Sequence, residues 1–465
     1  MAKVKRTLMT LVALAALAAT AQQPKYIFYF IGDGMGMGPV MSALNYKRTV
    51  QPLPQPKLTM TGFPVVSFCQ TWSASAPVTD SAAAGTALST GHKTRNTMLG
   101  MDADTLSVTS VARILKDGGW GVGVLTTVAP DDATPGAFYA HVPSRTQFYD
   151  IDIQAANSGY DFLGGASWRG AKSDNDVMKV FASKGYKTYY GPEGMKEISG
   201  TDKVVLLGNP SSNFNSNNVS YTIDSVAGAL SLPAMTETAL KHLERVSPNR
   251  FFMMVEGGNI DHALHANDGG AATKEIVNFD EAITIAYNFY LQHPDETLIV
   301  VTADHDTGGL TVGNSKLKYD AKVDMIDYQK ISKDKFSDYC KSLLISKNPA
   351  PTWDWMQNYL KENLGMWKVV PVTDAQTEQL KKDYENMIAK VGEDEKTLYA
   401  SYNNFAVAVF KIVNDAAGFG FTTSSHTGNP VPVFAVGVGA DRFKSLNNNN
   451  EIPVTLLELV EGSKK

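Results

Sequence analysis

Acidic residues and histidines with the chemistry of metal ligands recur in short turns of this chain. Asp261 and His265 are four residues apart, so one helical turn would bring both side chains to the same face. Asp304 and His305 are adjacent, and His426 opens a His-Thr-Gly turn. Since the chain has only two cysteines, this mixture of imidazole nitrogen and carboxylate oxygen favours zinc over a thiolate-bound metal.

A second set of residues offers mostly oxygen atoms as metal ligands. Asp33 lies in the turn Gly-Asp-Gly-Met-Gly, Asp132 and Thr134 lie in Asp-Ala-Thr-Pro, and Glu256 follows an apolar run. Carboxylates and hydroxyls of this kind suit magnesium. Arg145, a few residues further on, offers a planar fork that can hold two phosphate oxygens.

Ser81 is the candidate nucleophile. It follows Asp80, a suitable helix N-cap, and precedes a run of alanines that would let a helix pack closely against a sheet. Ser81 would then lie at the positive end of a helix dipole, where an anionic group is favoured. An Asp-Ser pair before alanines is usually only a cap, and the metal-ligating residues elsewhere favour the functional interpretation.

Three apolar runs position these side chains. Residues 26–31, 251–255 and 298–302 read as strands buried on both faces, and each is followed by an acidic candidate: Asp33, Glu256 and Asp304. Strands alternating with helices, such as 272–291, predict an α/β fold with a doubly wound, mostly parallel central sheet flanked by helices. In such sheets, ligands bind beyond the carboxyl ends of the strands.

The chain divides into three predicted parts. Residues 1–21 resemble a signal peptide, with a basic start, an apolar centre and an Ala-Thr-Ala cleavage site. Residues 22–465 form the α/β domain, which a largely helical inserted lobe at about 310–420 interrupts. The two cysteines, Cys69 and Cys340, are interpreted as free or buried thiols.

Charge and hydropathy limit the partners. The formal net charge is −5, and removal of the first 21 residues would make it −8, which gives no reason to expect nucleic-acid binding. No later segment is long and apolar enough to span a bilayer. We therefore expect an exported protein, periplasmic or secreted, with no transmembrane segment in the mature chain.

Taken together and in this order, the motifs resemble those of the alkaline phosphatases. The matching motifs are Gly-Asp-Gly-Met-Gly, Thr-Asp-Ser-Ala-Ala, Asp-Ala-Thr-Pro, Val-Glu-Gly-x-x-Ile-Asp, Thr-Ala-Asp-His and His-Thr-Gly. The resemblance implies two zinc sites, one with Asp261, His265 and His426, the other with Asp33, Asp304, His305 and the nucleophile Ser81. It also implies a magnesium site with Asp33, Thr134, Glu256 and, in its outer shell, Asp132, and a phosphate clamp at Arg145.

The family's activity is the hydrolysis of phosphate monoesters through a phosphoserine intermediate, and a homodimer is a further implication of the resemblance. One alternative is a related two-zinc phosphodiesterase, and another is a secreted zinc-binding protein with an inactive site. The metal of the third site stays open, because Asp132 follows the bacterial pattern whereas His262 follows the animal one. A sulfatase is disfavoured, since its Cys/Ser-x-Pro-x-Arg signature is absent around Ser81.

Overall fold

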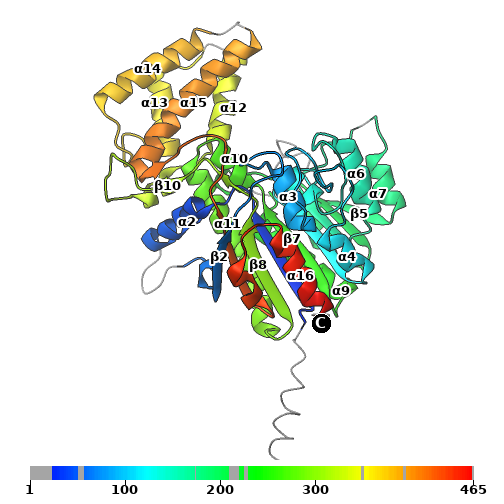
Figure 1. Ribbon diagram of the computed structural model, residues 1–465. Helices are drawn as coiled ribbons and strands as arrows, with labels where there is room; N and C mark the ends of the chain where they lie inside the picture. The colour runs from blue at the N-terminus through cyan, green and yellow to red at the C-terminus, as the bar shows by residue number, and fades with distance from the viewer. Residues whose placement is uncertain are drawn as a thin grey trace, which may run out of the picture.

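The computed structural model describes residues 23–50, 57–172, 174–208, 219–224, 229–346, 350–390 and 394–462. The predicted signal peptide lies outside these residues. A nine-stranded sheet with the order β2-β13-β8-β1-β7-β3-β4-β6-β5 forms the centre (Figure 1). Its strands are β1 (Tyr26–Gly32), β2 (Val65–Cys69), β3 (Gly121–Thr126), β4 (Phe162–Gly165), β5 (Tyr186–Tyr190), β6 (Lys203–Leu207), β7 (Phe251–Gly257), β8 (Thr297–Ala303) and β13 (Val431–Gly437).

Helices cover both faces of this sheet, and the alternating side chains of β1 contact both layers of helices. Phe28 and Phe30 pack against aromatic rings of α11 (Gly269–Gln292), whereas the Tyr29 hydroxyl donates to the Leu88 carbonyl of α3 (Ser81–Thr90) on the opposite face. The helices α2 (Met37–Val50) and α9 (Leu232–Val246) pack against α11, and α4 (Val111–Asp117), α5 (Ala133–Gly136) and α16 (Glu451–Glu461) pack against α3.

Parallel register aligns the carboxyl ends of the three central strands. Gly32 at the end of β1 pairs with Gly257 of β7 on one side and with Ala303 of β8 on the other. Among the nine strands, β13 alone runs opposite to the other eight, and it pairs antiparallel with β2 and β8. The predicted mostly parallel α/β sheet is therefore confirmed, and the turns that follow β1, β7 and β8 meet at one edge.

The outer half of the sheet carries short helices that the sequence analysis does not predict. These are α6 (Phe148–Asn157), α7 (Val177–Ser183) and α8 (Gly191–Glu197). α6 packs against α7, α7 packs against β5, and α8 packs against β5 and β6. The turn that follows β4 brings a further arginine to the edge of the sheet.

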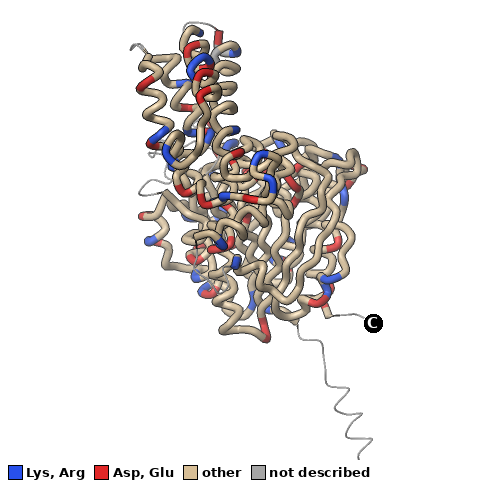
Figure 2. Tube along the Cα trace, turned by 90° about the vertical axis from the view of Figure 1, so that its left-hand side faces the viewer, with Lys and Arg blue, Asp and Glu red and all other residues tan. Residues whose placement is uncertain are grey.

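A helical lobe rises above the sheet domain (Figure 1). It contains α12 (Lys333–Ile345), α13 (Trp353–Leu364), α14 (Asp374–Ile388) and α15 (Glu395–Ala417), which share a second hydrophobic cluster. Figure 2 shows basic and acidic residues interspersed along these helices. These four helices agree with the largely helical lobe that the sequence predicts, and α15 is the longest of them.

The ends of the lobe lie together. The short strands β10 (Thr311–Val312) and β11 (Phe419–Gly420) pair, with Thr311 opposite Gly420. This pairing supports the proposal that about 310–420 is an insertion. Residues up to Ile326 still pack in the core of the sheet domain, whereas the separate core of the lobe starts at Ile331.

Neither cysteine is bonded to the other. Cys69 lies at the end of β2 and Cys340 in α12, and both are free and buried. No helix in the described ranges is long and apolar enough to cross a membrane.

Candidate active site

Two carboxylates and one imidazole converge at the carboxyl ends of β1 and β8. Asp304 Oδ1 accepts hydrogen bonds from the backbone N–H groups of Gly34, at 3.0 Å, and His305, at 2.9 Å, which fixes its other oxygen toward the His305 ring. His305 Nε2 lies 3.1 Å from Asp304 Oδ2 and 3.4 Å from Asp33 Oδ1. All three side chains are buried.

Ser81 joins the same cluster. It is the first residue of α3, only 4% exposed, and its Oγ lies 3.2 Å from His305 Nε2. In a Ser-His-Asp triad, the carboxylate would lie on the other ring nitrogen, Nδ1. Here both carboxylates lie on the Nε2 side together with the serine, and Nδ1 faces the Thr307 hydroxyl at 3.2 Å. The arrangement therefore fits ligands around a common cation better than a general-base triad.

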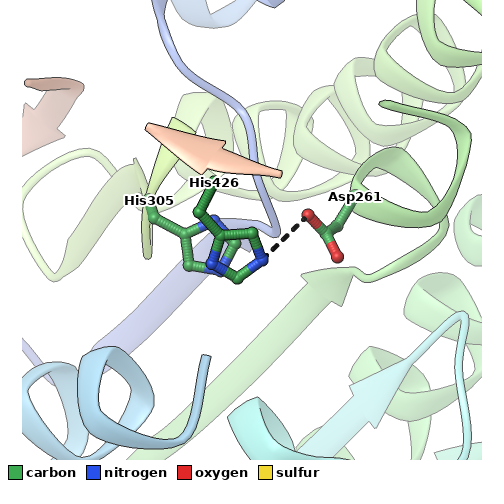
Figure 3. Close-up of side chains that lie close together, drawn as sticks. All are labelled: Asp261, His305 and His426. Carbon is green, nitrogen blue, oxygen red and sulfur yellow. Dashed lines mark ion pairs between the residues drawn. The ribbon is translucent and has the colours of Figure 1, made fainter. Parts of the chain in front are cut away.

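A second group of candidate ligands lies beside the first (Figure 3). Asp261 and His265 lie on the helix α10 (Asn259–His265), as their spacing predicted, and His426 lies on the short strand β12 (His426–Thr427). His265 Nε2 is 3.3 Å from Asp261 Oδ2 and 3.1 Å from His426 Nε2. Asp261, His305 and His426 place one ligand atom each within 4.8 Å of one another, so the buried imidazole of His305 is shared between the two groups.

The histidine tautomers also point to metal ligation. His265 Nδ1 lies 2.6 Å from the Ser424 carbonyl, and His426 Nδ1 lies 2.8 Å from the Thr79 carbonyl. A carbonyl oxygen can only accept, so each Nδ1 donates, and the Nε2 atom of each ring would carry the lone pair when the ring is in its neutral, metal-binding form. Backbone acceptors of this kind commonly orient metal-bound histidines.

The carboxylate of Asp261 favours positive charge on the side chain beside it. The hydrogen bond with Asp261 raises the pKa of His265 to about 9, whereas burial, followed by the charge of His305, lowers that of His426 to about 4. Thr307, which the sequence analysis missed, donates to Asp261. A cation bound here would replace the proton that Asp261 attracts.

Buried oxygens without hydrogen-bond partners mark where cations would fit. Within the described part of the chain, these include Asp33 Oδ1, Thr134 Oγ1, Glu256 Oε1 and Asp304 Oδ2. Burial raises the pKa of Glu256 to about 8, and burial together with the neighbouring carboxylates raises the pKa of Asp33 well above its usual value. Such crowding is costly unless positive charge compensates it, so these residues fit divalent cations.

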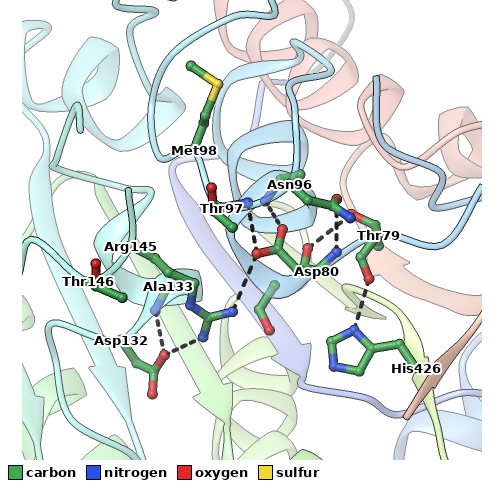
Figure 4. A network of polar contacts seen from close by, with 12 residues as sticks. Thr79, Asp80, Asn96, Thr97, Met98, Asp132, Ala133, Arg145, Thr146 and His426 are labelled. Atoms are coloured by element: carbon green, nitrogen blue, oxygen red, sulfur yellow. Dashed lines mark hydrogen bonds and ion pairs between the residues drawn. The ribbon is translucent and has the colours of Figure 1, made fainter. Parts of the chain in front are cut away.

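Arg145 lies between two carboxylates (Figure 4). Its Nη2 donates to Asp132 Oδ1 at 2.8 Å, and its Nη1 lies 3.6 Å from Asp80 Oδ2. Asp80 caps α3 through the Ala83 N–H at 3.0 Å and also accepts from the Thr97 N–H at 2.9 Å. The residue next to Ser81 therefore helps to hold the guanidinium beside the start of that helix.

Arg169 is a second arginine at this edge, and the sequence analysis missed it. It follows β4, and its Nη2 lies 3.2 Å from Asp132 Oδ2. Its Nε lies 3.1 Å from Asp131 Oδ1, and its guanidinium stacks on Phe148. Burial raises the pKa of Asp132, but Arg169 and Arg145 outweigh it and lower that pKa to about 2.

Asp131 belongs to a buried carboxyl pair. Its partner, Asp152 on α6, has a pKa raised to about 10 by burial and by the charge of Asp131, which favours the protonated form of Asp152 at neutral pH. Asp131 contacts Arg169, and Arg169 in turn contacts Asp132, so the buried carboxyl pair is linked to Asp132. The imidazole of His262, half-buried on α10, also contributes to the lowered pKa of Asp132.

Comparison with known proteins places the chain in one family. The alkaline phosphatase family model matches residues 24–165 and 156–461. Alkaline phosphatase 4 of Bacillus subtilis is 29% identical over 448 residues, which cover 94% of this chain and 89% of that protein. Among solved structures, the cold-active alkaline phosphatase of a psychrophilic Shewanella has a TM-score of 0.79 at 28% identity, covering 93% of this chain and 99% of its own.

The enzyme of Thermus thermophilus is similar to the same extent, with a TM-score of 0.77 at 27% identity over 95% of this chain and 92% of its own. The matches extend over the sheet domain and the turns that carry Ser81, the histidines and the buried carboxylates. This chain belongs to the alkaline phosphatase family of phosphomonoester hydrolases.

Proposed function

We propose that the protein hydrolyses phosphate monoesters to an alcohol and inorganic phosphate through a covalent phosphoserine intermediate at Ser81. One observation carries the proposal: Ser81 Oγ, Asp33 Oδ1 and Asp304 Oδ2 all lie within 3.4 Å of His305 Nε2. A nucleophile among ligands of a common cation fits displacement at phosphorus.

Two zinc ions and one magnesium ion fit the donor sets. The zinc ligands would be Asp261, His265 and His426 at one site and Asp33, Asp304, His305 and Ser81 at the other. The magnesium ligands would be Asp33, Thr134 and Glu256, with Asp132 nearby, and the unpartnered oxygens of Thr134 and Glu256 support this assignment. When bound, the ions supply Lewis-acid charge that lowers the pKa of the serine and of water and stabilises the departing alcohol oxygen.

The chain's own residues orient the phosphate. Arg145, held by Asp80 and Asp132, would present its guanidinium to two non-bridging oxygens of the phosphoryl group. Ser81 Oγ forms a bond to phosphorus while the bond to the alcohol oxygen breaks on the opposite side. Water then attacks the phosphoserine, phosphate leaves, and the Ser81 hydroxyl is regenerated.

The test compares kcat/KM for an aryl phosphate monoester and the matching diester, with zinc and magnesium present and again after chelation. We expect a strong preference for the monoester, and we expect chelation to abolish the activity. The preference follows because Arg145 and the cation of the third site would compensate the additional negative charge that a monoester carries. A diester preference would contradict the proposal and support the related two-zinc phosphodiesterase. Metal content without turnover of either ester would support an inactive zinc-binding protein.

Export and assembly are part of the same proposal. We infer that residues 1–21 direct the chain to the periplasm or the medium and that the mature protein acts there on small-molecule phosphate monoesters. N-terminal sequencing of the exported protein should begin at Gln22, and an intact leader would contradict export by cleavage. A homodimer is tested by light scattering after size-exclusion chromatography.

A further inference from the structure

A cleft of about 940 Å³ opens between the metal-ligand residues and the helical lobe. His262 and His265 of α10 lie on one side of it, and residues of α12 and α15 lie on the other. Figure 1 shows α10 at the foot of these two lobe helices. The size falls within the range of pockets that enclose small organic ligands.

Three neighbouring imidazole rings connect this cleft to Ser81. His426 stacks on His305 with ring centroids 3.6 Å apart, and its centroid is 4.9 Å from that of His265. Ser81 contacts His305 at one end of this row, whereas the cleft borders His265 at the other end. Ser81 and the cleft therefore contact different rings of the cluster, with His426 between those two rings.

In-line displacement puts the leaving oxygen opposite the attacking oxygen. With Ser81 Oγ attacking from the His305 end, the departing alcohol points toward the His265 end. The alcohol part of the substrate would therefore enter the cleft beneath α15.

One face of α15 gives the cleft its chemistry. Tyr399, Asn403 and Val407 follow one another at four-residue spacing and line the cleft. Tyr399 is 58% exposed and Val407 is 45% exposed, so a ring could pack against them. Asn403 and, on α12, Ser337 make no side-chain hydrogen bond within the described ranges, which leaves an amide and a hydroxyl for a ligand.

The charged residues of the cleft are already engaged. Lys411 pairs with Asp415 at 3.1 Å, and Lys333 donates to the Ala266 carbonyl at 2.8 Å. Asp334 accepts from the Tyr221 hydroxyl at 3.0 Å. A second anionic group on the substrate would find little uncompensated charge, so the cleft favours a neutral alcohol.

We propose that this cleft binds the alcohol part of the substrate and that the preferred substrates are phosphate monoesters of neutral, ring-bearing alcohols of nucleoside size. The inference rests on the proposed phosphomonoesterase function. It assigns a recognition role to the helical lobe.

The first experiment compares kcat/KM for adenosine 5′-monophosphate with that for glycerol phosphate. The wild type should prefer the nucleotide, and Tyr399→Ala should reduce that preference by about fivefold or more, because stacking on an aromatic side chain contributes on that scale. Asn403→Ala should reduce it less, and Tyr399→Phe should keep it. Tyr319→Ala, at a fully exposed tyrosine outside the cleft, is the matched control and should leave the ratio unchanged.

The second experiment measures binding of adenosine, which has no phosphate, to the chelated protein by isothermal titration calorimetry. We expect binding that Tyr399→Ala weakens by the same factor and Tyr319→Ala does not. Equal nucleotide preference in wild type and Tyr399→Ala, or no adenosine binding, overturns the inference. Hydrolysis of glycerol phosphate but not of the nucleotide would overturn the inference about the cleft and still support the proposed function. Hydrolysis of neither ester, together with adenosine binding, would contradict the proposed function and still support the cleft as a binding site.

Discussion

Two groups of buried carboxylates in the sheet domain differ in what satisfies them. At the carboxyl edge of the sheet, one oxygen each of Asp33, Glu256 and Asp304 has no hydrogen-bond partner within the described part of the chain. These side chains come from three adjacent strands and turn toward one another. Nothing in the fold requires them there, since a strand can end in a glycine turn without a buried charge.

The other group lies along α11 and is fully bonded. Asp280 accepts from the backbone N–H groups of Thr59, at 2.7 Å, and Met60, at 3.0 Å. Asp268 accepts from the N–H groups of Ala271 and Lys333 and so ties the start of the lobe to α11. Asp280 and Asp268 therefore accept N–H donors with both oxygens, whereas Asp33, Glu256 and Asp304 each keep one oxygen without a hydrogen bond within the described part of the chain.

The largest effect should follow a change in the unpartnered group. Asp304→Asn keeps Oδ1 as the acceptor for Gly34 and His305 but removes the charge that faces His305 Nε2. We expect kcat/KM for an aryl phosphate to fall by about a thousandfold, since metal charge is worth several kcal/mol in the transition state. The chelated variant should stay folded, because Oδ1 still accepts both backbone hydrogen bonds, and a cooperative urea transition would show this. Activity within tenfold of wild type would show that Asp304 holds no cation.

The partnered group should behave in the opposite way. Asp280→Ala leaves two backbone N–H groups without their acceptor, so the free energy of unfolding should fall by about 3–4 kcal/mol. Urea denaturation with an unchanged slope measures this loss. The kcat/KM of the folded variant should stay within about twofold of wild type, and Asp280→Asn, which keeps an acceptor, should lose less stability. A large drop in activity would mean that the two groups are not separable.

Stability should also report the titration of Asp280. Burial raises its pKa to about 6 in the folded state, above the ordinary value of 3.8. Because the folded pKa is the higher one, this carboxyl contributes most at low pH, and the contribution is lost as pH rises through about 6. The difference in unfolding free energy between wild type and Asp280→Asn should fall by about 2 kcal/mol from pH 4 to pH 7. A constant difference would place Asp280 in a solvated environment.

The smallest expected effect concerns Arg169, which fixes the carboxylate that holds Arg145. Arg169→Ala should lower kcat/KM by about tenfold, an effect typical of residues that orient groups in a site, mainly through a higher KM and weaker inhibition by inorganic phosphate. Arg169→Lys keeps a positive charge near Asp132 and should recover part of the loss. If Arg169→Ala and Arg169→Lys lose kcat and phosphate affinity to the same extent as each other, Arg169 has a merely structural role.

The sequence predicted the fold, and it located most residues of the candidate site, because both sets of signals are local. Asp33 and Asp304 each follow a continuous apolar run, and parallel strands bring such positions to one edge, as the pairing of Gly32 with Gly257 and Ala303 shows. The four-residue spacing of Asp261 and His265 needs only one helical turn.

The missed residues depend on tertiary contacts. Arg169 follows β4, a four-residue strand that contains two glycines and gives no apolar run. Asp152 lies in a short helix, and only its burial against Asp131 distinguishes it from a surface acid. The stripe of Tyr399, Asn403 and Val407 could not be assigned to a cleft, because its opposite wall, α10, lies over a hundred residues earlier in the chain.

The most direct test of the account is to trap the covalent intermediate. The metal-loaded enzyme is quenched in acid during steady turnover of an aryl phosphate monoester, digested, and analysed by mass spectrometry. The account predicts one phosphoryl group on the peptide that contains Ser81, and none on Ser81→Ala, which should have lost turnover. Sustained turnover by the wild type with no phosphate on Ser81 would contradict it.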